Sequence, residues 1–277
     1  MILESKKDEE AINIIDEAIL LKQSHRFRDP RQLEKDYLLT LLLFEIYREF
    51  DYRLIFKGGT SLKYFYNLNR FSEDLDFSYT GKNSSEERGM ITGKFERVID
   101  SLDMEYKVVR REHRGNKENG TVTGINFELR IQGPLNERLG QMQNIAIDVS
   151  LRNDVLKGPE NKYLLPPYQD IPLFLVPVMN VEEIVAEKIA SIMEMDRMRD
   201  IYDLYFLLHL RGVKYDDSLL LEKMNRRGER FDMGVLKEKI NEANNLMKWT
   251  SELSYLINPL PANSNVVQTI EELLHLD

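Results

Sequence analysis

The sequence from residue 56 to residue 77 reads FKGGTSLKYFYNLNRFSEDLDF. Its first motif, Lys-Gly-Gly-Thr-Ser at 57–61, lies between a predicted strand at 53–56 and a predicted helix at 62–68. Glycines allow a ligand to approach the backbone closely, and a helix N-terminus presents unpaired N–H groups to an anion. The motif therefore predicts a phosphate site, in which the threonine and serine hydroxyls either cap the helix or touch the phosphate. It is not a Walker A loop, because Lys57 precedes the glycines.

The second motif places two carboxylates at alternating positions. Asp74 and Asp76 flank Leu75 in a predicted strand at 75–78, so both side chains should project from one face of a sheet. Two neighbouring carboxylates repel each other unless a cation lies between them. Oxygen ligands at this spacing suit Mg²⁺, which proteins bind through one or two carboxylates plus substrate phosphates.

A third candidate is Asp148, an isolated acid in a β-rich apolar segment at 143–151. If that strand lies beside the strand that carries the pair, three acids at strand ends can hold metal ions that clamp both oxygens of a phosphoryl displacement. Asp148 can also act as a base toward an attacking hydroxyl. The alternative is a strand-end acid that pairs with a nearby Arg or Lys.

The pattern of the whole chain predicts an α+β fold: a small mixed β-sheet core flanked by helices, followed by a C-terminal helical domain. We expect the α/β core with its N-terminal helices at 1–151, a proline-rich connecting loop at 152–180 and the helical domain at 181–277. Further helices are predicted at 7–24, 31–50, 84–102, 181–195, 200–210, 216–226, 232–250 and 265–276, and further strands at 104–112 and 121–131, joined by a turn at 115–120.

Composition narrows the classes of function. The 277 residues contain 38 Lys and Arg, 47 Asp and Glu and no Cys, which gives a formal charge of −9 and excludes disulfides, thiolate zinc sites and a cysteine nucleophile. The four His residues lack metal-ligand spacing. No apolar run approaches the length of a membrane span and the N-terminus does not resemble a signal peptide, so a soluble, cytoplasmic protein is expected.

An acidic chain can bind nucleic acid only through a local basic patch. Two clusters are candidates for contacts to an RNA backbone: one contains Arg110, Arg111, His113, Arg114 and Lys117, and the other contains Arg226, Arg227 and Arg230. A charged hairpin and a solvated loop explain the same residues equally well.

In this order, the Gly-Gly-Thr-Ser step, the Asp-x-Asp pair and a third strand Asp resemble the polymerase-β-like nucleotidyltransferase superfamily. The segments FKGGTSL and RFSEDLDF look like those of its AbiEii/AbiGii toxin branch, and the segments at 183–189 and 199–204 match a later helical motif of that branch. The resemblance covers roughly residues 34–210, and we find no matching motif in 211–277.

The resemblance implies a role for each matching residue. It implies that Asp74 and Asp76 bind Mg²⁺, that Lys188 contacts a triphosphate from the helical half, and that Asp203 or Asp200 completes the site. Asp148, as the third strand Asp of the superfamily pattern, is the further catalytic candidate. The nucleotide-binding residues would be Lys57, Gly58, Gly59, Thr60, Ser61, Arg70 and Asp200. The superfamily pattern is Gly-Ser, whereas here Thr60 separates Gly59 from Ser61. Ser61 therefore stands one position later than the serine of that pattern.

The residues themselves leave other interpretations open. Lys188 has Glu187 as its neighbour, so both can belong to a solvated helix face. Asp200 and Asp203 share a helix face and follow Arg197 and Arg199, so they can cap or pair instead of binding a ligand. Arg70 can form a salt bridge to Glu73 or Asp74 instead of contacting a triphosphate.

The function implied by the resemblance is that of a Mg²⁺-dependent nucleotidyltransferase toxin of a type IV-like toxin–antitoxin or abortive-infection system. It would transfer NMP from an NTP to an RNA acceptor, with the tRNA 3′ end as the first candidate, and would have a cognate antitoxin. The alternatives are a phosphotransferase that acts on that antitoxin and a non-catalytic module that binds GTP or another nucleotide. An aspartate-nucleophile phosphatase does not fit, because a polar segment precedes Asp74.

Overall fold

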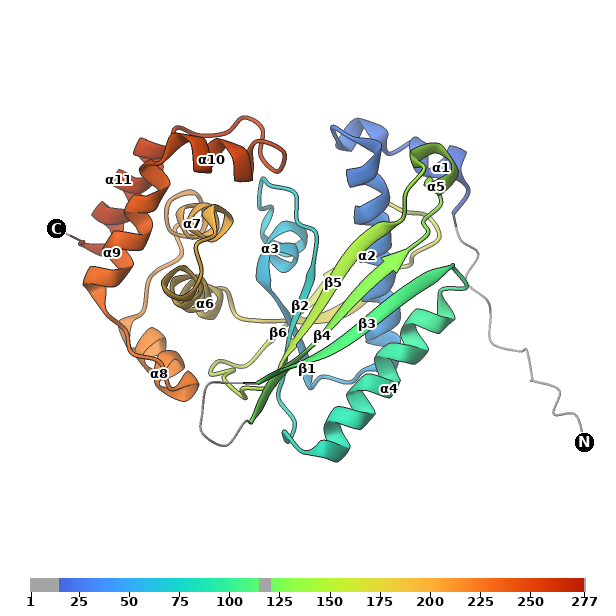
Figure 1. Cartoon of the computed structure of the whole chain (residues 1–277), viewed down its shortest axis with the longest axis horizontal. Coiled ribbons are helices and arrows are strands. Elements are labelled where there is room, and N and C mark those ends of the chain that lie inside the picture. The colour runs from blue at the N-terminus through green and yellow to red at the C-terminus, as the bar shows by residue number, and fades with distance from the viewer. Residues whose placement is uncertain (1–14, 115–120, 277) are drawn as a thin grey trace, which may run out of the picture.

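The computed structural model describes residues 15–114 and 121–276. The turn expected at 115–120 and the first part of the helix expected at 7–24 lie outside the described residues. Within them, seven strands form one mixed sheet in the order β3-β4-β5-β2-β1-β7-β6 (Figure 1). The strands are β1 (Leu54–Lys57), β2 (Leu75–Tyr79), β3 (Tyr106–Arg114), β4 (Val122–Ile131), β5 (Gln143–Ser150), β6 (Glu160–Leu164) and β7 (Phe174–Val178).

The register of the sheet places polar residues in one row. Lys57 on β1 pairs with Asp76 on β2, Asp76 with Asp148 on β5, and Asp148 with Asn126 on β4. Residues paired across adjacent strands project from the same face, so this row lies on one side of the sheet. β1 and β2 are antiparallel, whereas β2 and β5 are parallel.

The opposite face of the sheet forms the hydrophobic core. Helices α2 (Pro30–Glu49) and α4 (Ser85–Ser101) lie along this face (Figure 1). The Phe95 ring of α4 contacts Phe77 and Phe127 from two strands, and Tyr47 of α2 also contacts Phe77. Phe77 follows Asp76 on β2, and Phe127 follows Asn126 on β4. Successive side chains of a strand point to opposite faces, so the aromatic rings and the polar row lie on opposite sides of the sheet.

Local signals explain where these helices begin. Pro30 is the first residue of α2, and the Asp29 carboxylate accepts a hydrogen bond from the Arg31 N–H. Helix α4 is capped by Ser84, whose hydroxyl accepts from the Glu87 N–H. Helix α3 (Gly58–Tyr66) begins four residues earlier than the sequence predicts, directly after β1, and Asn67 ends it in the left-handed conformation.

The segment at 152–180, which we expected to be a loop, contributes two strands to the sheet. β6 and β7 are antiparallel to each other, and β7 pairs in parallel with β1 through Phe56 and Val178. Pro159, Pro166, Pro167 and Pro172 flank these two short strands and do not interrupt them. The chain that leads to the helical half is therefore itself part of the sheet.

The helical half begins at α6 (Val181–Glu194), which is capped by the Asn180 side chain. The helix expected at 200–210 is α7 followed by a π-helical turn, and the helix expected at 232–250 is two helices separated by a short 3₁₀ turn. The remaining helices of the described residues are α1 (Glu17–Leu21), α5 (Asn136–Leu139), α7 (Met198–Tyr205), α8 (Asp217–Arg227), α9 (Met233–Asn241), α10 (Leu246–Leu253) and α11 (Asn263–Leu274), with turns at Ser24–Arg26, Phe206–Leu210 and Glu242–Asn244. No helix of the described residues is long and apolar enough to cross a membrane.

Glu194, at the end of α6, and Glu229, just after α8, form an acidic pair that makes the stability of the fold depend on pH. Burial, together with the neighbouring carboxyl group of Glu194, raises the pKa of Glu229 to about 7 from 4.5. Because the folded state holds this proton more tightly than the unfolded state, stability is lost as pH rises from 4.5 through 7. We expect Glu229→Gln to stabilise the protein by about 1–2 kcal/mol at pH 8 and to have little effect at pH 4. Urea denaturation at both pH values measures this, and an equal gain at both would contradict it.

Candidate active site

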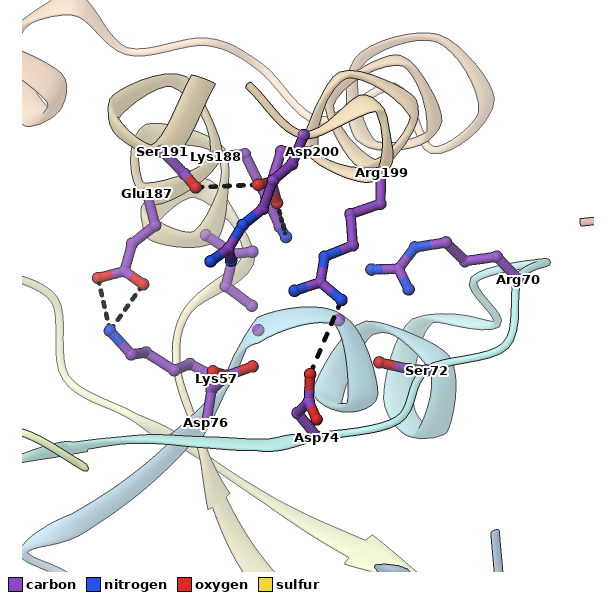
Figure 2. Close-up of a pocket in the computed structure, with 14 residues that line it drawn as sticks. Lys57, Arg70, Ser72, Asp74, Asp76, Glu187, Lys188, Ser191, Arg199 and Asp200 are labelled. Carbon is purple, nitrogen blue, oxygen red and sulfur yellow. Dashed lines mark hydrogen bonds and ion pairs between the residues drawn. The ribbon is translucent and has the colours of Figure 1, made fainter. Parts of the chain in front are cut away.

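A polar pocket lies between the row of polar residues on the sheet and helices α6 and α7 (Figure 2). Eight of the twelve site residues predicted from sequence line it, whereas Thr60, Ser61, Asp148 and Asp203 do not. The lining residues are Lys57, Gly58, Gly59, Arg70, Ser72, Asp74, Asp76, Ile184, Glu187, Lys188, Ser191, Arg197, Arg199 and Asp200.

The two glycines form the first turn of α3 at the wall of the pocket. This turn is the N-terminus of a nine-residue helix, so its N–H groups have no partner within the helix and its dipole favours an anion. Gly58 has φ +73°, and a Cβ atom there would overlap the Asp76 carboxylate. A Cβ atom at Gly59 would overlap the Arg70 guanidinium. The turn therefore brings the backbone close to both a carboxylate and a fixed cation.

The hydroxyls of Thr60 and Ser61 point away from the pocket. Both residues are fully buried. The Ser61 hydroxyl donates back to the Gly58 carbonyl at 2.8 Å. The Thr60 hydroxyl lies 2.9 Å from Ser72 Oγ and 2.5 Å from the Asp74 carbonyl oxygen. Their side chains brace the turn and the loop that carries Asp74, and only their backbone can face an anion at the helix N-terminus.

The three predicted carboxylates lie on adjacent strands. Burial raises the pKa of Asp76 to about 6, and the charges of Asp74 and Asp148 add to this effect. Burial also raises the pKa of Asp74, against the opposing effect of Arg199. Asp148 is about half exposed; it accepts from Asn126 Nδ2 at 3.1 Å and lies 3.5 Å from His113 Nε2. The like charges around Asp76 are those that a bound cation would relieve.

The donor set at this position fits Mg²⁺. Within residues 15–114 and 121–276, no three acidic or histidine side chains form a ready metal-binding group. Two carboxylates, Asp74 and Asp76, line the pocket beside the helix N-terminus. Mg²⁺ is commonly held by one or two carboxylates while phosphate oxygens and waters complete its octahedral shell. These two side chains could therefore hold Mg²⁺ together with a phosphorylated substrate.

Asp203 lies beneath the pocket and fixes two of its cations. Arg70 Nε and Nη2 donate to the two Asp203 oxygens at 2.6 and 2.7 Å, and Lys188 Nζ lies 2.6 Å from the same carboxylate. Asp203 is fully buried. Burial alone would raise its pKa, but Arg70 and Lys188 outweigh that effect and lower it. Arg70 thus pairs with Asp203, and not with Glu73 or Asp74 as the alternative interpretation held.

Lys188 is buried, which contradicts the interpretation of its helix face as solvated. Its ammonium group also contacts Asp200 Oδ1 at 2.7 Å, and the Ser191 hydroxyl donates to the other oxygen of Asp200 at 3.0 Å. Burial opposes the charged form of Lys188, but Asp200 and Asp203 raise its pKa above the ordinary value. The lysine is therefore held as a cation at the edge of the pocket.

Comparison with known proteins assigns the chain to a family. The family model of the nucleotidyl transferase AbiEii toxin of type IV toxin–antitoxin systems matches residues 41–274. The chain belongs to the AbiEii family. A search of curated protein sequences finds no match.

Solved structures share the fold of this AbiEii-family chain. The nucleotidyltransferase toxin MenT4 (Rv2826c) of Mycobacterium tuberculosis H37Rv is 20% identical, with a TM-score of 0.62 over 95% of this chain and 91% of that chain. A putative nucleotidyltransferase from H. pylori is 18% identical, with a TM-score of 0.57 over 90% of this chain and 95% of that chain. JHP933 from Helicobacter pylori is 18% identical, with a TM-score of 0.50 over 90% and 92%. The shared architecture includes the C-terminal helices.

Glu187, Ser191 and Ser72 line the AbiEii-family site although sequence reasoning did not assign them to it, whereas it did weigh Arg197 and Arg199 as a phosphate contact. Glu187 contacts the Lys57 ammonium group at 2.9 Å, and Arg199 Nη1 lies 3.7 Å from Asp74 Oδ2 (Figure 2). Glu187 and Ser191 are four residues apart on α6, next to Lys188, so helical spacing could have indicated a shared face. Ser72 lines the pocket only because the loop after α3 folds back over that helix, and no local sequence signal predicts this.

Most basic residues of the two clusters form ion pairs with acidic residues of the same chain. Arg110 pairs with Glu112 at 2.7 Å and Arg111 with Glu128 at 2.8 Å, while Lys117 lies outside the described residues. Arg226 pairs with Glu222, and Arg227 is buried against acidic residues of other elements. The expectation that Arg227 contacts an RNA backbone is therefore wrong, because its guanidinium is not accessible.

Substitution of Gly58 tests the close approach of the backbone to Asp76. We expect Gly58→Ala to destabilise the protein by about 1–2 kcal/mol through its positive φ, and to lower nucleotide transfer at least about 10²-fold by displacing the Asp76 carboxylate. Gly89→Ala is the matched control, because nothing lies within 4 Å of its added Cβ in the exposed part of α4. Urea denaturation and a transfer assay measure both variants. Full activity of Gly58→Ala would show that Asp76 does not depend on this turn.

Proposed function

We propose that this AbiEii-family protein is a Mg²⁺-dependent nucleotidyltransferase toxin that transfers NMP from an NTP to the 3′-hydroxyl of an RNA, with tRNA as the first candidate acceptor. The observation that carries the proposal is the position of Asp74 and Asp76 opposite the N-terminal turn of α3, with fixed cations around the same pocket. A triphosphate needs both a metal site and preorganised positive charge, and the pocket offers both.

Different residues of the pocket would bind the triphosphate and the metal ion. The N–H groups of the Gly58-Gly59 turn and the cations of Lys57, Arg70 and Lys188 would hold the triphosphate. Asp74 and Asp76 would hold Mg²⁺, which neutralises phosphate charge and polarises the α-phosphate. Arg199 lies beside Asp74 and is about one-third exposed, so its guanidinium would add positive charge at the triphosphate.

The transfer step makes one bond and breaks one. The acceptor 3′-oxygen attacks the α-phosphorus in line, the bond between that phosphorus and the bridging oxygen breaks, and pyrophosphate leaves. The hydroxyl proton passes to the Asp148 carboxylate, which lies beside Asp76 and is open to solvent. Asp203 positions Arg70 and Lys188 from below the pocket and does not contact the nucleotide.

The family's toxin–antitoxin context supports two further parts of the proposal. We propose that a cognate antitoxin opposes the activity and that the protein acts in the cytoplasm, where tRNA and NTPs are available. A phosphotransferase that modifies the antitoxin would use the same nucleotide pocket, but it would transfer the γ-phosphate instead of NMP.

The test is incubation with each α-³²P-labelled NTP, Mg²⁺ and total tRNA. The wild type should label tRNA with one preferred NTP, and the Asp74→Asn/Asp76→Asn double variant should not. Asp196→Asn is the control, because this acid is half exposed and pairs with Lys239 and Lys248 away from the pocket. Label transferred from γ-³²P-ATP or γ-³²P-GTP to a protein would favour the phosphotransferase, and nucleotide binding without any transfer would favour a binding module.

A further inference from the structure

A buried cluster of charges joins the nucleotide pocket to α8, in the part of the chain where no motif was found. We name it the α8 charge cluster, and its six side chains are 0–13% exposed. They come from β1, the segment after β5, α6 and α8. The members are Lys57, Asp154, Glu183, Glu187, Lys223 and Arg227.

Glu187 is the centre of this cluster. Its carboxylate lies 2.9 Å from Lys57 Nζ, 2.7 Å from Arg227 Nη2 and 3.2 Å from Lys223 Nζ. Burial alone would raise the pKa of Glu187, but these three cations lower it well below its usual value. The carboxylate therefore stays ionised and is shared among three positive groups. Lys57 and Glu187 both line the pocket, whereas Arg227 and Lys223 do not.

Arg227 bridges two carboxylates at once. Its Nε donates to Asp154 at 2.7 Å while its Nη2 donates to Glu187 at 2.7 Å. Only a planar guanidinium offers two donors in such a fixed fork. Lys223 is held separately, by Glu183 at 2.7 Å and by the Asp154 carbonyl oxygen at 2.9 Å. Arg227 thus fixes Glu187 through Oε1, an oxygen that it shares with Lys57, whose Nζ lies 3.1 Å away.

The cluster contains three cations and three carboxylates, so its charges balance. Without Arg227, one negative charge would be in excess, and Glu187 would be shared by two cations instead of three. That excess would strengthen the attraction of Glu187 for Lys57 and leave less of the lysine charge for a triphosphate, because Coulomb interactions are strong where water is largely excluded. With Arg227 present, Glu187 orients Lys57 without fully neutralising it.

We propose that Arg227 of α8 is a positioning residue for the nucleotide site: through Glu187 it holds the Lys57 ammonium group at the phosphate end of the pocket. This inference rests on the proposed function, since it assumes that the pocket binds an NTP. It assigns a role in the site to a helix that follows every motif in the sequence.

The test measures nucleotide affinity of the full-length chain by titration calorimetry with ATP, CTP, GTP and UTP, each with Mg²⁺. Arg227→Gln should raise the Kd of the NTP that the wild type prefers by about tenfold. Arg227→Lys keeps the charge but loses the bridge, so its loss should be smaller. Arg226→Gln is the control on the same helix, since Arg226 is 44% exposed and pairs with Glu222; its Kd should match the wild type.

A double-mutant cycle separates positioning from stability. In a Lys57→Gln background, Arg227→Gln should change the Kd less than twofold, because the group through which it acts is absent. Should Arg227→Gln fail to fold, Arg227→Lys in both backgrounds gives the same comparison. An unchanged Kd in a folded Arg227 variant, or full additivity with Lys57→Gln, would overturn this inference alone. Absence of NTP binding by the wild type would overturn the proposed function as well.

Discussion

Replacing Asp76 by Asn is expected to lower nucleotide transfer by on the order of 10³-fold or more and, at the same time, to stabilise the fold. The substitution removes, at nearly constant volume, a charge that we propose binds Mg²⁺. It also removes a carboxylate whose pKa is raised to about 6 from 3.8 by burial and by Asp74 and Asp148. Ionisation of this group therefore costs stability, which is lost as pH rises from 3.8 through 6.

The expected gain in stability for Asp76→Asn is about 2 kcal/mol at pH 7.5 without Mg²⁺, and it should vanish near pH 4. Urea denaturation in EDTA measures the gain, and the labelled-NTP assay measures transfer. The same substitution at Asp51 is the control: this acid is half exposed and pairs with Arg53, which lowers its pKa. Asp51→Asn should keep full transfer and gain no stability. Transfer by Asp76→Asn at the wild-type rate would remove Asp76 from the reaction.

Replacing Asp203 by Asn is expected to have the largest effect on folding. Asp203 is fully buried and carries the charge that balances Arg70, which is 3% exposed, and part of that which balances Lys188. Removal of one partner of a buried pair leaves an uncompensated charge, which costs about 3–5 kcal/mol. We expect Asp203→Asn to lower the free energy of unfolding by that amount, measured by urea denaturation, and to weaken NTP binding.

The control for Asp203→Asn is Asp196→Asn, in the loop before α7. Asp196 is half exposed and pairs with Lys239 and Lys248 at the surface, so its loss should cost less than about 0.5 kcal/mol. A stability of Asp203→Asn equal to that of the wild type would mean that Arg70 and Lys188 find other partners. The role of Asp203 as the support beneath the pocket would then be withdrawn.

Sequence reasoning predicted those parts of the fold that depend on local pattern. Alternation along β2 indicated that Asp74 and Asp76 share a face, whereas it was the family resemblance that assigned Lys188 to the site. The proline positions in 152–180 indicated a loop, but β7 in this segment pairs with β1, which lies more than 100 residues earlier, and β6 pairs with β7. Sequence alone does not specify such a partner.

The parts of the site that could not be predicted depend on side-chain direction and on distant contacts. Thr60 and Ser61 stand in the correct turn, but the hydroxyl of Thr60 is used to hold the Asp74 loop and that of Ser61 to close the turn. Arg70 has acidic neighbours in sequence, yet its partner is Asp203, 133 residues later. The three cations that contact Glu187 come from β1 and α8, which are distant from it in the sequence, so no local pattern indicated them.

The parallel pairing of β7 with β1 bears on when a newly made chain becomes active. β1 ends at Lys57, and β7, which covers its free edge, ends at Val178. At a synthesis rate of about 5–20 residues per second, roughly ten seconds separate the translation of these two strands. The pocket also needs α6 and α7, which follow β7 in the chain. A ribosome-bound chain therefore cannot complete this pocket until most of its length is made.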